Sequence, residues 1–322
     1  MAIDLWPLFQ IKKEVEFKQN ELSISVDALP KQFIDGTLRV GHETRCKLLY
    51  GAPENRGGYG TIYLAKRLAN EVLDICVKVP HTPSFSLCSE ALIQWYVSDT
   101  LKKGGIHGAV PEIYDIFQYA GETRVSMSFI KGVRSLEWIL ASPTPEKTFM
   151  QLLEQVSLIL AYLEEKISFD HRDLKGDNIW IRPTPVNYSL KVGGTVWTVA
   201  APFQVVILDF GFSCLGGPDG NAVVSLSDGI LPVIDPCPKD GRDLFQLIAS
   251  LWSIPIFRAK MSEEFQKEID ALLSYKNKPY ASLVKQTIET RWVYLLVSDS
   301  GFAHPPLHPL SLLRLGLRKI GT

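Results

Sequence analysis

The spacing of apolar residues changes once along this chain, near residue 131. From about residue 46 to 129, short β-branched or aromatic runs are separated by Gly, Pro and Asn, a pattern typical of β-strands. Further on, apolar residues recur with the helical period of about 3.6 residues. The segments with that period are 145–167, 243–253, 262–274 and 280–297. Strands followed by helices predict an α+β fold of two lobes with a cleft between them.

Three domains are expected along the chain. Residues 1–43 carry no motif and are expected to form an amino-terminal extension. Residues 44–130 are expected to form a strand-rich amino lobe, and residues 131–322 a mainly helical carboxy lobe. One predicted helix lies inside the amino lobe, because the apolar residues of segment 84–103 recur every three to four positions.

Composition narrows the class of protein and its partners. The chain has 322 residues, 46% apolar and 21% charged, with a net charge of −1. This composition is globular, and the near-zero charge provides no basic field for direct binding of nucleic acid. No stretch reaches the roughly 18 apolar residues that a membrane helix needs, so we expect a soluble intracellular protein without a membrane partner. The oligomeric state stays open.

The five cysteines lie far apart, and no Cys-x-x-Cys pair is present. That spacing argues against a zinc site and against a disulfide framework. We therefore expect reduced thiols at Cys46, Cys76, Cys88, Cys214 and Cys237.

Residues 168–181, "SFDHRDLKGDNIWI", place five charged side chains and a His between two apolar runs. The segment contains "HRDLKGDN", which resembles the catalytic-loop motif H-R-D-L-x-x-x-N of protein kinases. In that motif a carboxylate, here Asp173, receives the proton of a substrate hydroxyl, and an amide, here Asn178, holds a metal ion. Lys175 would neutralise the phosphoryl group during its transfer. The alternative is a polar turn between a helix and a strand.

Three further motifs stand in the order found in that family. "VVILDFG" is an apolar strand that ends in a D-F-G element, so Asp209 is a second candidate metal ligand. "ICVK" resembles V-A-I-K and makes Lys78 the candidate contact to the α- and β-phosphates of a nucleotide. Glu90, in the predicted helix, is the candidate partner of Lys78.

"NRGGYGTIYLA" resembles the glycine-rich loop that covers nucleotide phosphates. Asn55 stands where the motif has its first glycine, and Asn tolerates positive φ better than most residues with side chains. Taken alone, the segment would equally suit a β-hairpin turn. Its candidate nucleotide-binding residues are Asn55, Gly57, Gly58, Gly60 and Ile62.

Over about residues 45–255 the chain therefore resembles the eukaryotic-type protein kinases. The resemblance implies ATP and Mg²⁺ as cofactors and a protein as substrate, with Ser or Thr as acceptor because Lys175 is typical of members with that specificity. It also implies an adenine pocket with Cys76, Met127 and Phe129. Asp243 would fasten the catalytic loop from behind.

The segment between Asn178 and Asp209 is longer than in most of that family. Two alternating runs flank Gly193-Gly194 and predict a hairpin within an insertion at about residues 183–203. This layout, together with the lack of an A-P-E motif, resembles the haspin-like kinases; an unrelated loop insertion is the alternative. The hairpin and the compact carboxy lobe also resemble kinases of large DNA viruses, which would place the protein in a host cell.

Two other functions remain open at this point. One is a pseudokinase, an interaction module that binds ATP without transferring phosphate; Asn55 and the lacking A-P-E motif favour it. The other is a small-molecule kinase of similar fold, although such enzymes typically lack the pattern of Arg172 and Lys175.

Overall fold

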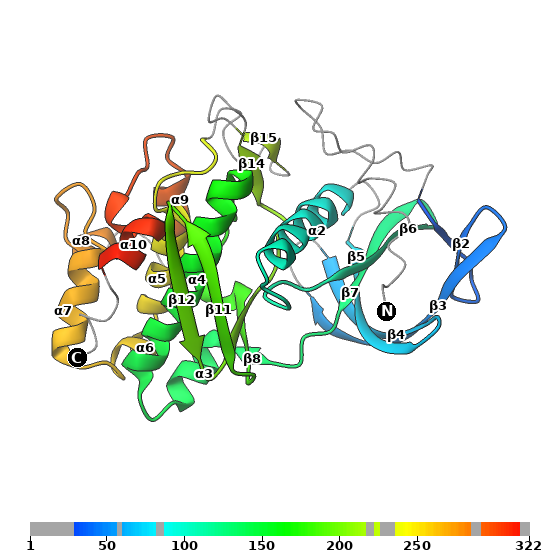
Figure 1. The fold of residues 1–322 in the computed structure, drawn as a ribbon, viewed down its shortest axis with the longest axis horizontal. Helices are drawn as coiled ribbons and strands as arrows, with labels where there is room; N and C mark the ends of the chain where they lie inside the picture. Colours follow the sequence, from blue (N-terminus) through cyan, green and yellow to red (C-terminus); the bar gives the residue numbers. More distant parts are fainter. Residues whose placement is uncertain are drawn as a thin grey trace. The chain divides into compact units, whose positions relative to one another are not determined.

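The computed structural model describes residues 29–56, 60–81, 87–216, 222–225, 236–284 and 291–315. The chain divides into two compact units, which are described separately below. Unit 1 comprises Met1–Ser98 and Val110–Ile130, and unit 2 comprises Asp99–Ala109 and Lys131–Thr322. Strands dominate unit 1 and helices dominate unit 2 (Figure 1), which confirms the mixed α+β class predicted from the sequence.

Seven strands of unit 1 close into a barrel in the order β1-β2-β3-β4-β5-β7-β6. They are β1 (Lys31–Gln32), β2 (Thr37–Val40), β3 (Glu43–Arg56), β4 (Gly60–Leu68), β5 (Val72–Pro80), β6 (Ile113–Tyr119) and β7 (Glu122–Ser128). Neighbours are antiparallel except at the closure, where β1 and β6 pair in parallel through Lys31 and Gln118. Residues 31–40 of the expected extension therefore form the first two strands of this barrel.

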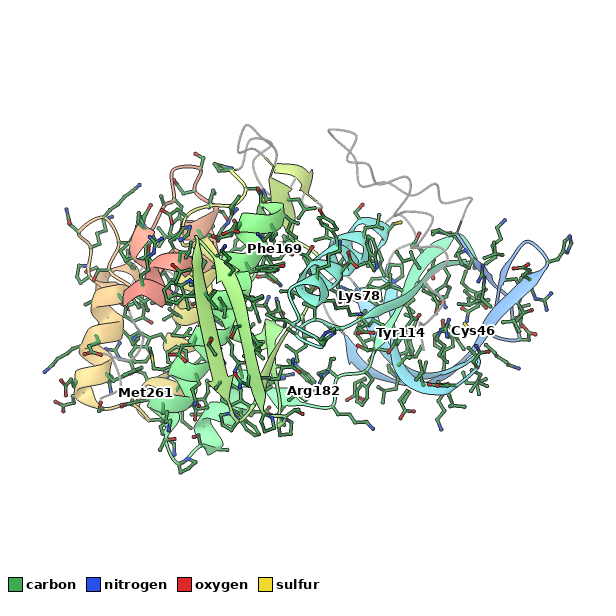
Figure 2. The ribbon with its side chains drawn as sticks, viewed as in Figure 1. Cys46, Lys78, Tyr114, Phe169, Arg182 and Met261 are labelled. Carbon is green, nitrogen blue, oxygen red and sulfur yellow. A yellow bond between two sulfur atoms is a disulfide. The ribbon has the colours of Figure 1, made fainter. Side chains whose placement is uncertain are left out.

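The interior of the barrel is apolar, and a buried ion pair lies beside its apolar cluster. Cys46 and Tyr114, labelled in Figure 2, belong to a cluster that also holds Leu38, Leu48, Ala65, Ile75, Val77 and Phe117. Beside it, the Nε atom of Arg67 donates to Asp115 at 2.9 Å. Asp115 accepts a further hydrogen bond from the Ser126 hydroxyl group, so both of its buried carboxylate oxygens have hydrogen-bond donors. Helix α2 (Cys88–Lys103) begins in unit 1 and ends in unit 2.

Unit 2 is built around the helix α4 (Pro145–Ile167), which occupies the residues predicted for it. Its other helices are α3 (Ser135–Ala141), α5 (Arg242–Trp252), α6 (Pro255–Arg258), α7 (Glu263–Leu272), α8 (Tyr280–Val284), α9 (Arg291–Ser298) and α10 (Pro309–Leu315), with short 3-10 turns at Gly176–Asn178 and Pro305–Leu307. The strands are β8 (Val133–Arg134), β9 (Phe169–Asp170), β10 (Ile179–Arg182), β11 (Val186–Val192), β12 (Thr195–Ala201), β13 (Gln204–Ile207), β14 (Cys214–Gly216) and β15 (Ala222–Ser225). No helix in these described segments is both long and apolar enough to cross a bilayer.

The expected hairpin is formed by β11 and β12, which turn at Gly193 and Gly194. Both glycines have positive φ, 57° and 76°, as the two central residues of a type I′ turn require. The hairpin lies along α4 (Figure 1), and its inward side chains at Leu190, Val192 and Val199 are buried. The insertion is thus packed into the apolar core of unit 2.

The cysteine prediction is wrong for two of the five residues. Cys214 of β14 and Cys237 form a disulfide, while Cys46, Cys76 and Cys88 are free. The two partners are 23 residues apart in the sequence. Because their approach depends on how β14 packs against the Pro236–Lys239 segment, the spacing of cysteines along the chain carried no sign of it.

Candidate active site

The segment His171–Asp173 is held from behind by Asp243, the first-turn acidic residue of α5. Its carboxylate oxygens accept the backbone N–H groups of His171 at 2.7 Å and Arg172 at 2.9 Å. Arg172 has a positive φ of 64°, a conformation that a residue with a Cβ adopts only when its surroundings enforce it. The fastening expected of Asp243 is therefore present as two buried hydrogen bonds.

Three side chains converge on Asp173. The Nζ atom of Lys175 lies 2.9 Å from its Oδ2 atom, and the side-chain amide of Asn178 donates to its backbone oxygen at 2.7 Å. From α5, Gln246 donates to Oδ1 at 3.3 Å. Burial lowers the pKa of Lys175, but the charge of Asp173 outweighs burial and holds that pKa above its ordinary value. A protonated ammonium group therefore stands beside the Asp173 carboxylate at neutral pH.

Strand pairing brings Asn178 and Asp209 together, although 31 positions separate them. Strands β10 and β13 are antiparallel, and the Leu208 N–H donates to the Asn178 backbone oxygen at 2.9 Å. The Leu208 carbonyl lies 3.0 Å from Nε2 of His171, whose pKa is lowered by burial, so the neutral ring donates here. Phe210 packs on the same ring at 5.3 Å. These contacts fix Asp209, which has a positive φ of 61° and an exposed side chain, next to Asn178.

Asn178 and Asp209 fit a magnesium ion by their chemistry. The Asn178 amide nitrogen is turned toward Asp173, which leaves its oxygen as the atom for other ligands. A carboxylate and an amide oxygen are hard ligands of the kind Mg²⁺ prefers, and Mg²⁺ usually takes only one or two protein carboxylates together with phosphates and water.

A buried cluster of charges supports the loop. Arg242, beside Asp243 in α5, donates through Nε to Oδ2 of Asp170 at 2.8 Å. Burial by itself would raise the pKa of the Asp170 carboxyl group and that of the Asp243 carboxyl group. At Asp170 the Arg242 guanidinium outweighs burial and the pKa is lowered, whereas at Asp243 the charge of Asp170 adds to burial and the pKa is raised well above its ordinary range.

In unit 1, Lys78 and Glu90 form a mostly buried ion pair, with Nζ and Oε1 2.5 Å apart. Lys78, which is labelled in Figure 2, lies in β5, and Glu90 lies in the first turn of α2. Other residues that the sequence suggests for nucleotide binding lie close by in the same sheet. Ile62 of β4 pairs with Lys78, and Met127 of β7 pairs with Cys76. The sequence therefore identified a real contact between residues twelve positions apart.

The remaining nucleotide candidates are placed unevenly. Cys76, Met127 and Phe129 are half-buried, and burial raises the pKa of Cys76 to about 11, so its thiol stays protonated. Gly60 begins β4, where a Cβ would crowd the Val79 carbonyl at 2.7 Å. Asn55 lies in β3 opposite Ile62. Gly57 and Gly58 lie outside the described residues.

Sequence reasoning missed the groups that support this loop from behind. Asp170, Arg242 and Gln246 belong to no motif, and Lys239 is a buried lysine whose Nζ donates to the carbonyl oxygens of Val297 and Asp299. The sequence did contain a sign that Arg242 is buried, because it stands next to Asp243 at the start of a segment that is otherwise rich in apolar residues.

Comparison with known proteins gives one partial similarity and no family match. A stretch of 98 residues is 29% identical to "Probable kinase 098L" of Invertebrate iridescent virus 3. The stretch covers 30% of this chain and only 19% of that viral protein. No protein-family model matches the chain. The chain is thus distantly and partially similar to a viral protein described as a probable kinase.

Proposed function

We propose that this protein is a kinase of protein-kinase fold that transfers the γ-phosphoryl group of ATP to Ser or Thr of a protein. The observation that carries the proposal is the convergence of Lys175, Asn178 and Gln246 on Asp173, in a loop whose backbone is held by Asp243. Phosphoryl transfer is catalysed mainly by positioning and electrostatic stabilisation, which such an arrangement provides. The similarity to a viral probable kinase supports the broad class.

Each residue of the loop has a separate role in this proposal. Asp173 orients the acceptor hydroxyl and accepts its proton, since its carboxylate is fixed by three neighbours. Lys175 stabilises negative charge that develops on the transferred group. Asn178 and Asp209 hold Mg²⁺, which when bound neutralises phosphate charge.

The residues of unit 1 bind the nucleotide in this proposal. Lys78, kept in place by Glu90, contacts the α- and β-phosphates. Asn55, Gly57, Gly58 and Gly60 cover the phosphates, while Ile62, Cys76, Met127 and Phe129 contact the adenine. Ser/Thr specificity and the haspin-like grouping rest on Lys175 and on the β11–β12 hairpin.

The test compares Asp173→Asn with Asp177→Asn. Asp177 belongs to the same loop, but its side chain is 72% exposed. With labelled ATP, Mg²⁺ and generic basic and acidic proteins, we expect phosphoserine or phosphothreonine from the wild type and from Asp177→Asn. Loss of the base should lower transfer by Asp173→Asn at least about 100-fold. ATP binding and the unfolding midpoint of Asp173→Asn should stay near wild type.

The two rival functions predict different results in the same assay. A pseudokinase binds ATP but labels no substrate and not itself. A small-molecule kinase hydrolyses or transfers from ATP only when metabolites with hydroxyl groups are supplied. Equal transfer by wild type and Asp173→Asn would contradict the role proposed for Asp173.

A further inference from the structure

The disulfide between Cys214 and Cys237 is buried directly beneath the catalytic-loop segment. Both residues are at most 1% exposed. Cys214 lies opposite Asp170 in the β14–β9 ladder, and Asp170 is the residue before His171. The disulfide therefore joins the strand that borders the loop to the segment Pro236–Lys239.

Backbone packing brings the two cysteines together independently of the bond between the sulfur atoms. Gly216 donates its N–H to the Ser168 carbonyl oxygen at 2.8 Å, and a Cβ at Gly216 would overlap the Cys237 carbonyl group. The Sγ atom of Cys237 lies 3.5 Å from the same Ser168 oxygen. In the reduced protein that oxygen can accept a hydrogen bond from the Cys237 thiol. The thiols would thus stay close enough to be oxidised again.

Both ends of the disulfide connect to Asp170. From one side, β14 pairs with it through Cys214. From the other side, the backbone N–H of Lys239 donates to its Oδ2 atom at 2.9 Å, and Arg242 donates both to that atom and to the Pro236 carbonyl. Since Arg242 and Asp170 border the Asp243 contacts to His171 and Arg172, a shift of this segment would reach the loop.

We propose that Cys214 and Cys237 are a thiol–disulfide modification site that controls how firmly the catalytic-loop segment is held. The inference rests on the proposed function where it predicts activity. The disulfide form keeps the segment fixed and active, and the dithiol form loosens it.

The chemistry is two thiol–disulfide exchanges with a small disulfide such as oxidised glutathione. One thiolate attacks the small disulfide, forming a mixed disulfide and releasing one reduced thiol. The second cysteine then attacks the protein sulfur of that mixed disulfide, forming the Cys214–Cys237 bond and releasing a second reduced thiol. Two protons leave the cysteines and two electrons pass to the small disulfide. Because both sulfur atoms are buried, the exchange requires local opening of this region.

Two of the other cysteines, Cys46 and Cys76, are poorly suited to the same reaction. Burial raises the pKa of Cys46 to about 12 and of Cys76 to about 11, so their reactive thiolate forms are scarce at neutral pH. Cys46 lies in the barrel core, which makes Cys46→Ala a suitable control.

The experiment equilibrates the full chain in buffers with graded ratios of reduced to oxidised glutathione. Differential alkylation and peptide mapping then give the fraction of linked Cys214 and Cys237, and phosphoryl transfer is measured on the same samples. We expect transfer to rise about tenfold as the linked fraction rises, because small displacements of catalytic groups have large effects on rate. Cys214→Ser and Cys237→Ser should match the reduced wild type and ignore the glutathione ratio, whereas Cys46→Ala should keep the response.

Two results would overturn the proposal. One is that Cys214 and Cys237 remain separately alkylatable in oxidised glutathione, and the other is that the bond forms without changing transfer. If no sample transfers phosphate, the proposed function fails by itself. Amide hydrogen exchange of His171 and Arg172 then decides the redox proposal: faster exchange after reduction supports it, and unchanged exchange overturns it.

Discussion

Arg242 directs two of its nitrogens, Nε and Nη2, at one oxygen of Asp170. Both side chains are at most 2% exposed. A buried ion pair of this kind gives little net stability by itself, because removing both charges from water is costly. Removing only one partner is far more damaging, since the other charge stays buried without compensation.

Arg242→Met should therefore lower the free energy of unfolding by about 3–5 kcal/mol. Arg134→Met is the matched control, because Arg134 is more than half exposed and 4.0 Å from Asp177. That change should cost less than about 1 kcal/mol. Urea unfolding of both variants measures the two costs, and equal values would contradict the role assigned to the buried pair.

Lys78 and Glu90 should be energetically coupled. The variants Lys78→Met, Glu90→Gln and the double variant form a double-mutant cycle, and we expect a coupling free energy of about 2 kcal/mol from urea unfolding. The more exposed pair Lys103 and Asp99, 2.7 Å apart with side chains 61% and 22% exposed, provides the control and should couple by no more than about 0.5 kcal/mol. Both single variants should also bind ATP less tightly than wild type. A coupling near zero for Lys78 and Glu90 would mean that the contact is not maintained in solution.

Glu164 should make stability depend on pH. Burial, with the charges of Asp170 and Asp240, raises its pKa from 4.5 to about 9, and His308 Nε2 lies 3.4 Å from it. Between these two values the folded protein keeps a proton that the unfolded chain has released. The stability contributed by protonated Glu164 is thus fully present below about pH 4.5. As the pH rises toward 9, the free energy of unfolding falls by up to about 1.4 kcal/mol per pH unit.

Glu164→Gln removes this titration, so wild type should lose stability relative to Glu164→Gln between pH 5 and pH 9. Urea unfolding of both proteins across that range measures the difference. Glu263→Gln, at an exposed position of α7, should stay parallel to wild type. A constant difference between wild type and Glu164→Gln would show that the carboxyl group is charged throughout.

The hairpin should contribute to stability through its inward face. Leu190 is 3% exposed and Val196, on the same hairpin, is 64% exposed. We expect Leu190→Ala to lower the free energy of unfolding by about 2–4 kcal/mol and Val196→Ala to change it by less than about 0.5 kcal/mol. Chemical denaturation measures both, and equal effects would mean that the hairpin detaches from α4 in solution.

Local patterns predicted the elements whose signals are local. The period of the apolar residues gave α4 from Pro145 to Ile167, and two adjacent glycines gave the β11–β12 turn. Both signals are contained within a few residues of chain, so no distant contact is needed to interpret them. The ion pair of Lys78 with Glu90 was found through motif order, because neither residue type alone indicates burial.

Long-range contacts were beyond local patterns. Nothing near Cys214 indicates Cys237, because their approach depends on Gly216 lying against the Cys237 carbonyl group. In the same way, the sequence alone makes Lys239 look like a surface lysine, because its two carbonyl acceptors are distant in sequence: Val297 in α9 and Asp299, the residue after that helix ends. Residues 31–40 looked like part of an extension because strands of two and four residues are too short for a visible alternation.

The parallel contact of Lys31 with Gln118 has a consequence for association with other chains. A sheet that ends in unpaired strands offers its free N–H and C=O groups to any extended peptide, which is a common route to aggregation and to strand exchange. Here each of the seven barrel strands has a neighbour on both sides. If the two-residue strand β1 separated from the barrel, one backbone edge of β6 and one of β2 would lose their hydrogen-bond partners. Strand β1 therefore protects unit 1 from pairing edge to edge with other sheets.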